Sequence, residues 1–192
     1  MKSLRLMFAV VLMSLVSALA LAQSEMRKAI DKVAPSEAQK SFELLKSVAG
    51  SWQGPVTVDP PQPEMGDGAV LKVSLRVTSR GNALVHEIGE LGKNDDPTKY
   101  DHPVTLFYVD GDKLFLTHYC DAGNRPRMVA RTSPDGKKVE FDFLDLSGGN
   151  ESGHMYHAVF TIIDANHHIE DWTYMMPGDK PLHAHMDLQR AK

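Results

Sequence analysis

The sequence predicts an all-β protein, an up-and-down antiparallel β-barrel of about ten strands preceded by one N-terminal helix. After Gly50 the apolar residues recur with a period of two, and turn signals follow one another almost to the C-terminus. That pattern is typical of a meandering antiparallel sheet. So many sequential hairpins leave few ways to protect edge strands, and closure into a barrel removes the edges altogether. A sandwich of two sheets is the alternative architecture.

The composition indicates one ordinary folded domain. The chain has 192 residues, of which 42% are hydrophobic and 24% charged, as in globular proteins with a real core. Acidic side chains outnumber Lys and Arg by 25 to 21, which gives a formal net charge of −4. Because binding to a phosphate backbone depends on excess basic charge, we expect no nucleic-acid partner.

The first 22 residues have the pattern of a signal peptide. Lys2 and Arg5 are their only charges, residues 6–21 are apolar apart from two serines, and Ala20-Leu21-Ala22 offers a small-x-small cleavage site. The protein is therefore expected to be periplasmic or secreted, with no membrane attachment after cleavage. An uncleaved anchor helix is the alternative. We expect residues 23–35 to be a flexible N-terminal segment, and residues 36–192 to form the helix and a single barrel domain.

A helix is predicted over residues 36–48. Ala38, Phe42, Leu45 and Val48 fall at helical spacing, Ser36 can cap the N-terminus, and Gly50 ends the pattern. A helix this short is marginal in water by itself. We therefore expect it to cover one end of the barrel.

Ten runs with strand-like alternation follow the helix. They are separated by turn sequences such as Asp110-Gly111, which is a strong hairpin signal. The expected strands are 52–58, 70–79, 84–91, 104–109, 113–120, 127–132, 138–146, 154–163, 168–175 and 182–190.

Gly50-Ser51-Trp52 at the start of the first strand and Arg190 at the end of the last form a recognisable pair. The arrangement resembles the Gly-x-Trp signature of lipocalins and their calycin relatives. That resemblance implies barrel-closing roles: Trp52 closes one end, and Arg190 stacks across its ring. A guanidinium over an indole is a favourable cation–π pair.

A second resemblance covers most of the chain after the leader. Three segments look like exported bacterial lipocalin-like proteins near the DUF1579-type families: residues 44–54, 117–128 and 164–172. The most specific parts are Thr117-His118-Tyr119-Cys120 and Pro126-Arg127-Met128. The resemblance implies a barrel with a site and brings no known chemistry with it.

Strand parity predicts which side chains look inward. On the fifth strand Leu114, Leu116, His118 and Cys120 share the aliphatic face. By the same rule we expect Leu106 and Tyr108 to point inward on the fourth strand, and Trp172 with Tyr174 on the ninth. An aromatic and aliphatic cavity with a few polar groups is the usual form of a small-molecule site.

The predicted ligand-binding residues are Tyr108, His118, Cys120, Arg127 and Trp172. Arg127 could clamp a ligand carboxylate, although it could equally lie on the surface or pair with Glu87 or Glu170. His118 could contact ligand or satisfy a neighbouring polar group. We interpret the protein as a monomer or weak homodimer that binds a small, largely apolar ligand.

Cys120 is the only cysteine, so no disulfide can form within the chain, and we expect it to be a buried small side chain. A barrel enzyme using His118 and Cys120 is an alternative, because a histidine can activate a nearby thiol. No other catalytic motif accompanies this pair. Catalysis is therefore not the preferred interpretation, and no catalytic residue is assigned.

Nine histidines raise the possibility of a metal or haem. His183 and His185 would share one strand face and could hold zinc or copper with a third ligand, but the opposite face is the apolar one, which favours their exposure to solvent. Residues 181–186 resemble the last strand of nitrobindins. That resemblance implies haem as a possible cofactor, with His185 as its axial ligand.

Overall fold

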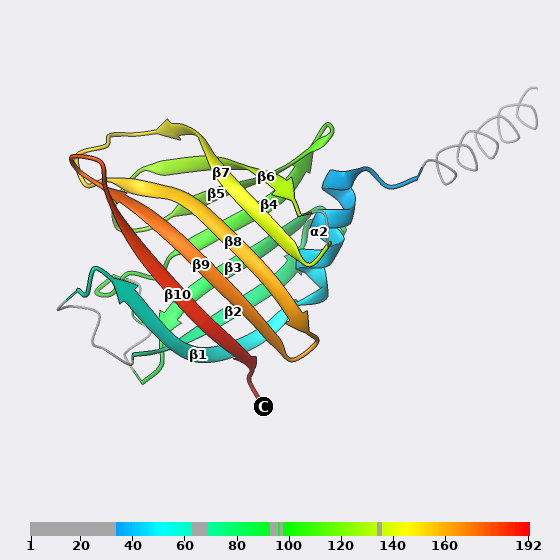
Figure 1. Cartoon of the computed structure of the whole chain (residues 1–192), viewed down its shortest axis with the longest axis horizontal. Helices are drawn as coiled ribbons and strands as arrows, with labels where there is room; N and C mark the ends of the chain where they lie inside the picture. The colour runs from blue at the N-terminus through cyan, green and yellow to red at the C-terminus, as the bar shows by residue number, and fades with distance from the viewer. Residues whose placement is uncertain (1–33, 63–68, 93–95, 97, 134–135) are drawn as a thin grey trace, which may run out of the picture. The chain divides into compact units, whose positions relative to one another are not determined.

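Ten antiparallel strands close into a barrel in which each strand pairs with its neighbours in the chain and β1 pairs with β10 (Figure 1). The predicted fold class is therefore confirmed. This computed structural model describes residues 34–62, 69–92, 96, 98–133 and 136–192, and residues 36–192 form one compact unit. The predicted signal peptide, and residues 23–33 of the segment after it, lie outside the described residues.

The strands agree with the predicted ones to within a few residues. Their bounds are β1 (Gly50–Asp59), β2 (Val70–Thr78), β3 (Ala83–Glu90), β4 (Val104–Asp110), β5 (Lys113–Tyr119), β6 (Arg125–Thr132), β7 (Lys138–Ser147), β8 (His154–Asp164), β9 (His167–Met176) and β10 (Lys180–Arg190). A single turn of 3-10 helix, η1 (Ser79–Gly81), joins β2 to β3.

Helix α2 (Glu37–Ser47) precedes the barrel and begins as predicted. Ser36 accepts a hydrogen bond from the backbone N–H of Gln39, and the Gln39 side chain accepts one from the backbone N–H of Ser36. This reciprocal capping box fixes the start of the helix. The buried face carries Phe42 and Leu45, and the helix packs against β2, β4, β5 and β6.

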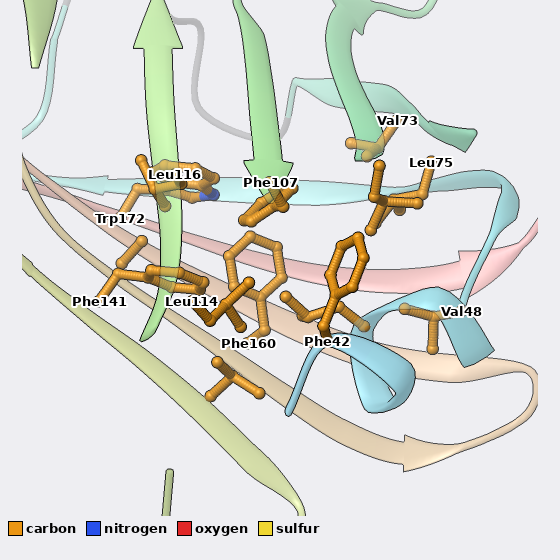
Figure 2. Close-up of a cluster of buried hydrophobic side chains, with 14 of the residues drawn as sticks. Phe42, Val48, Val73, Leu75, Phe107, Leu114, Leu116, Phe141, Phe160 and Trp172 are labelled. Atoms are coloured by element: carbon orange, nitrogen blue, oxygen red, sulfur yellow. The ribbon is translucent and has the colours of Figure 1, made fainter. Parts of the chain in front are cut away.

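The half of the barrel beside α2 is filled by large side chains. Phe107, Phe141 and Phe160 meet with ring centroids 5.4 to 6.1 Å apart, and Phe42 of the helix lies against the same cluster (Figure 2). The other fully buried apolar residues include Leu84, Leu114, Leu116, Met128, Val139 and Leu188. This end of the barrel is therefore a packed core.

Trp52 and Arg190 close the same end. The guanidinium carbon of Arg190 lies 4.2 Å from the centroid of the Trp52 ring, which is the stacking that the Gly-x-Trp resemblance implies. The guanidinium also donates to the carbonyls of Ala165 and Ala49, at 2.8 and 3.1 Å. Gly50 has a φ of 147°, and a Cβ there would collide with Arg190 Nη1, so the position requires glycine.

The predicted parity of β4 is wrong. Thr105 and Phe107 point inward, whereas Leu106 and Tyr108 lie on the outer face. The register pairs Thr105 with His118 and Phe107 with Leu116, and directly paired residues of antiparallel strands share a face. Because β4 is apolar on both faces, its sequence alone could not reveal which one is buried.

Candidate functional site

The end of the barrel away from Trp52 and α2 is hollow. It holds a cavity of about 440 Å³, which is within the range of small-molecule sites and is roughly the volume of fifteen liquid water molecules. Its walls are mainly aliphatic and aromatic. The apolar lining includes Val56, Leu71, Ile88, Met155, Leu182 and Met186.

His118 brings a polar group to this cavity. Its side chain is 1% exposed, and its Nδ1 lies 2.8 Å from the Thr105 hydroxyl oxygen. This hydrogen bond fixes the orientation of the imidazole ring. Its Nε2 has no partner among the described residues. Burial, with a smaller effect from the charge of His86, lowers the pKa of His118 to about 3, so the imidazole is neutral at pH 7.

Trp172 lies beside His118 and forms part of the cavity wall. The two ring centroids are 5.7 Å apart. The indole N–H donates a 3.0 Å hydrogen bond to Oε2 of Glu170 on the same face of β9. This bond fixes the ring, so the carboxylate positions the wall that a ligand would touch.

Glu170 is the centre of a buried cluster between the packed core and the cavity. Nε2 of His86 lies 3.0 Å from Glu170 Oε2, and Nε2 of His168 lies 3.0 Å from Oε1. All three side chains are fully buried. Burial alone would raise the pKa of the Glu170 carboxyl, but the charge of His86 and the hydrogen bonds from both imidazoles lower it below its usual value.

An ionised carboxylate only accepts hydrogen bonds, so Nε2 of both His86 and His168 must carry the hydrogen. Their Nδ1 atoms are buried and have no partner within the described ranges. His168 also meets Trp52 edge to face, with centroids 4.3 Å apart. The cluster therefore connects the closed end of the barrel with the cavity wall.

The mouth of the cavity is acidic. Asp101, Asp121 and Cys120 place their side-chain ligand atoms within 4.8 Å of one another, and Glu90 adds a further carboxylate to the lining. Burial and then the charge of Asp121 raise the pKa of Asp101. Burial, reinforced by the charges of both aspartates, also raises the pKa of the Cys120 thiol, so the thiol stays protonated at neutral pH.

Three of the five predicted ligand residues come together. His118, Cys120 and Trp172 all line the cavity. Tyr108 does not: it lies on the outer face, where it stacks on Phe115 with centroids 5.9 Å apart. Its inward placement was wrong because the parity of β4 was misread.

Arg127 is also outside the cavity. Its Nε donates to Asp145 Oδ1 at 3.2 Å, and its guanidinium lies over the outer ring of Phe115. The prediction that Arg127 reaches the ligand is therefore wrong, and so is the pairing with Glu87 or Glu170. Asp145, across the β6–β7 pairing, is close enough to neutralise the arginine on the outer face of the barrel.

The histidines of β10 face outward, as the alternation predicts. Nδ1 of His185 lies 2.6 Å from Asp171 Oδ1, and the His185 side chain is 50% exposed. Nδ1 of His183 lies 3.1 Å from the hydroxyl oxygen of Thr173, also on the exposed face. His185 cannot reach the cavity, so the residues do not fit a haem held inside the barrel through that histidine, and His185 as axial ligand is a wrong prediction.

Two features of the site were missed. His168, Glu170, Trp172 and Tyr174 alternate along β9, so the predicted inward position of Trp172 already implied an inward Glu170. Gly123, and not Asn124, takes the positive-φ conformation of this turn, with a φ of 72°. Asn124 is instead buried and donates to the carbonyls of Gly149 and Gly153, which ties two loops together at the open end.

The fold and site define a closed ten-stranded barrel with one packed end and one hollow end. No protein-family model and no curated protein matches the sequence. Among solved structures, the crystal structure of Rv2717c from M. tuberculosis matches 84% of this chain and 100% of its own length, with a TM-score of 0.57 and 13% sequence identity. At that identity the likeness shows a shared fold.

No helix in the described part of the chain is long and apolar enough to cross a membrane.

Proposed function

We propose that this protein binds a small, largely apolar molecule in the hollow end of the barrel. The observation that carries the proposal is a cavity of about 440 Å³ with apolar walls and one buried imidazole nitrogen, Nε2 of His118, that has no partner among the described residues. A buried polar atom without a partner is costly. A ligand that donates to or accepts from it would remove that cost.

The arrangement favours binding over nucleophilic catalysis. An activated cysteine needs a lowered thiol pKa, whereas burial and the charges of Asp101 and Asp121 raise the pKa of Cys120. His118 uses its Nδ1 for Thr105. These features support a passive role for both residues as parts of a ligand-binding wall.

The proposal is tested by extracting the purified, folded protein with organic solvent and identifying the released molecules by mass spectrometry. A stoichiometric apolar compound supports the proposal. If nothing is released, the empty protein is screened against apolar compounds by tryptophan emission and by thermal melting. Absence of any bound compound in both experiments would contradict a binding function.

We also propose export, on the basis of residues 1–22 alone. A basic lead, an apolar stretch and an Ala-x-Ala site predict cleavage after Ala22. N-terminal sequencing of protein from the periplasmic or culture fraction tests this. A mature chain that begins at Gln23 supports export, and an intact N-terminus in the cytoplasmic fraction contradicts it.

A further inference from the structure

We propose that the ligand carries a cationic group, such as a protonated amine, which binds between Asp101 and Asp121 at the mouth while its apolar part occupies the cavity. This inference rests on the proposed binding function and specifies the chemical class of the ligand. It depends on the charges that surround the mouth and on their spacing.

The charged residues that line the cavity are all acidic. Asp101, Asp121 and Glu90 contribute carboxylates, and among the described lining residues there is no Lys or Arg. Lys99 and His102 line a neighbouring hollow that shares Asp101 and Asp121 with the cavity, and Lys99 pairs with Asp96 at 3.0 Å. The charge of His102 lowers the pKa of Asp101, but burial and Asp121 outweigh it and leave the pKa raised. An anionic ligand would therefore meet repulsion at the entrance, and a cation would meet attraction.

The spacing of the two aspartates suits an ammonium. Their nearest carboxylate oxygens lie within 4.8 Å of each other. A charge-assisted N–H···O bond is about 2.8 Å long, so one nitrogen can donate to two oxygens up to roughly 5.5 Å apart. Asp101 Oδ1 also accepts the backbone N–H of Asp121 at 3.1 Å, which holds the two residues together.

Neighbouring negative charges add to the effect of burial on the pKa values of groups at the mouth. Burial, followed by the charges of Cys120, Asp121 and Asp101, raises the pKa of Tyr174 to about 12. The pKa values of Asp101 and Cys120 are raised as well. All three groups thus resist adding negative charge to this region, and a bound cation would relieve that resistance.

A second, independent feature points to a ligand here. His118 is almost fully buried, lines the same cavity, and its Nε2 has no partner within the described ranges. Trp172 and Tyr174 line the same cavity. Because aromatic faces attract cations, the walls and the entrance favour the same ligand charge.

The test compares decylamine, decanol and decanoate, which share one chain and differ in head-group charge. Binding is measured by calorimetry at pH 7, at low salt and with EDTA present. We expect decylamine to bind at least tenfold more tightly than decanol, and decanoate most weakly. High salt should reduce the advantage of the amine, because exposed charges are screened.

The matched variants are Asp101→Asn with Asp121→Asn, and Glu87→Gln as the control on the outer face of β3. The double variant should bind decanol normally and lose the preference for decylamine, whereas the control keeps it. Equal binding of amine and alcohol to the wild type, or a preference that survives the double variant, would overturn the cationic head group while leaving the binding function intact. If none of the three compounds binds, the proposed function fails together with this inference.

Discussion

The indole nitrogen of Trp172 lies 3.0 Å from Oε2 of Glu170, so a wall of the cavity is bound directly to a buried carboxylate. The same carboxylate accepts from His86 and His168. A ligand that contacts Trp172 therefore contacts a side chain whose orientation depends on a charge fixed deep inside the barrel.

Glu170→Gln tests this dependence. The new amide places N–H donors against the N–H groups of Trp172 and the two imidazoles, so at least one donor loses its acceptor. Breaking a buried charged network typically costs about 3 kcal/mol or more. We expect a loss of that size in urea unfolding and a shift in Trp172 emission. Asp171→Asn, on the outer face beside His185, is the control and should leave the emission unchanged.

His118 makes stability depend on pH. Its pKa is about 3 in the folded protein and about 6.5 when unfolded. The unfolded chain therefore binds the extra proton first. The contribution of His118 is complete above pH 6.5 and is lost as the pH falls towards 3, by about 1.4 kcal/mol per pH unit within that window.

The check is urea unfolding at a series of pH values for the wild type and for His118→Phe, which keeps a ring at this position. The variant should show a shallower decline between pH 6 and pH 4. His154, whose pKa is lowered by burial, contributes equally to both proteins. Identical slopes in the two proteins would rule out a neutral, buried His118.

Glu170 adds a second pH effect, which begins within the lower part of this range. Because its folded pKa is lowered, its contribution is present above about pH 4.5 and is lost as the pH falls further. In Glu170→Gln, the stability lost on acidification below pH 4.5 should therefore be smaller than in the wild type. An equal loss of unfolding free energy below pH 4.5 in the variant and the wild type would mean that Glu170 is not ionised in the folded protein.

Cys120 reports on occupancy of the cavity. It is half-buried, lines the cavity, and has a raised thiol pKa. We expect slow alkylation by iodoacetamide at pH 7 that accelerates at higher pH, since only the thiolate reacts. A saturating cavity ligand should slow the reaction several-fold. A rate that does not respond to ligand would place the binding site elsewhere.

Arg190 should contribute to stability through more than its charge. Arg190→Lys keeps the charge but loses the planar stacking on Trp52 and the fork that reaches the carbonyls of Ala165 and Ala49. We expect a loss of about 1–3 kcal/mol in thermal or urea unfolding. Arg125→Lys, whose exposed side chain contacts Ser147, is the control and should cost little. An equally mild effect at both positions would mean that the closed end does not depend on this stacking.

The sequence predicted the barrel well because its evidence is local. Alternation and turn residues located ten strands, and Gly50, Trp52 and Arg190 located the closed end. The strand alternation also predicted the inward faces of β5 and β9 correctly. On β5 one face is aliphatic, and on β9 the inward face carries Trp172, the only tryptophan of that strand. The alternation failed on β4, where both faces are apolar and only the pairing of Thr105 with His118 reveals which is buried.

The site was only partly predictable because its polar residues come from distant strands. Glu170 is joined to His86 across 84 positions of the chain, and no local pattern marks such a pair. Arg127 looked suitable for a ligand, but Asp145 neutralises it on the outer face. Which charges meet inside a barrel depends on closure and register, and these emerge only in three dimensions.

The central claim is that the hollow end of the barrel holds an apolar molecule. The most direct test measures decanol binding by calorimetry in the wild type and in a variant whose cavity is filled by a larger side chain. Ala184→Phe adds a ring to the cavity wall, and His183→Phe adds the same ring to the outer face of the same strand. We predict that decanol binds the wild type and His183→Phe and does not bind a folded Ala184→Phe. Equal binding to all three proteins would contradict the account.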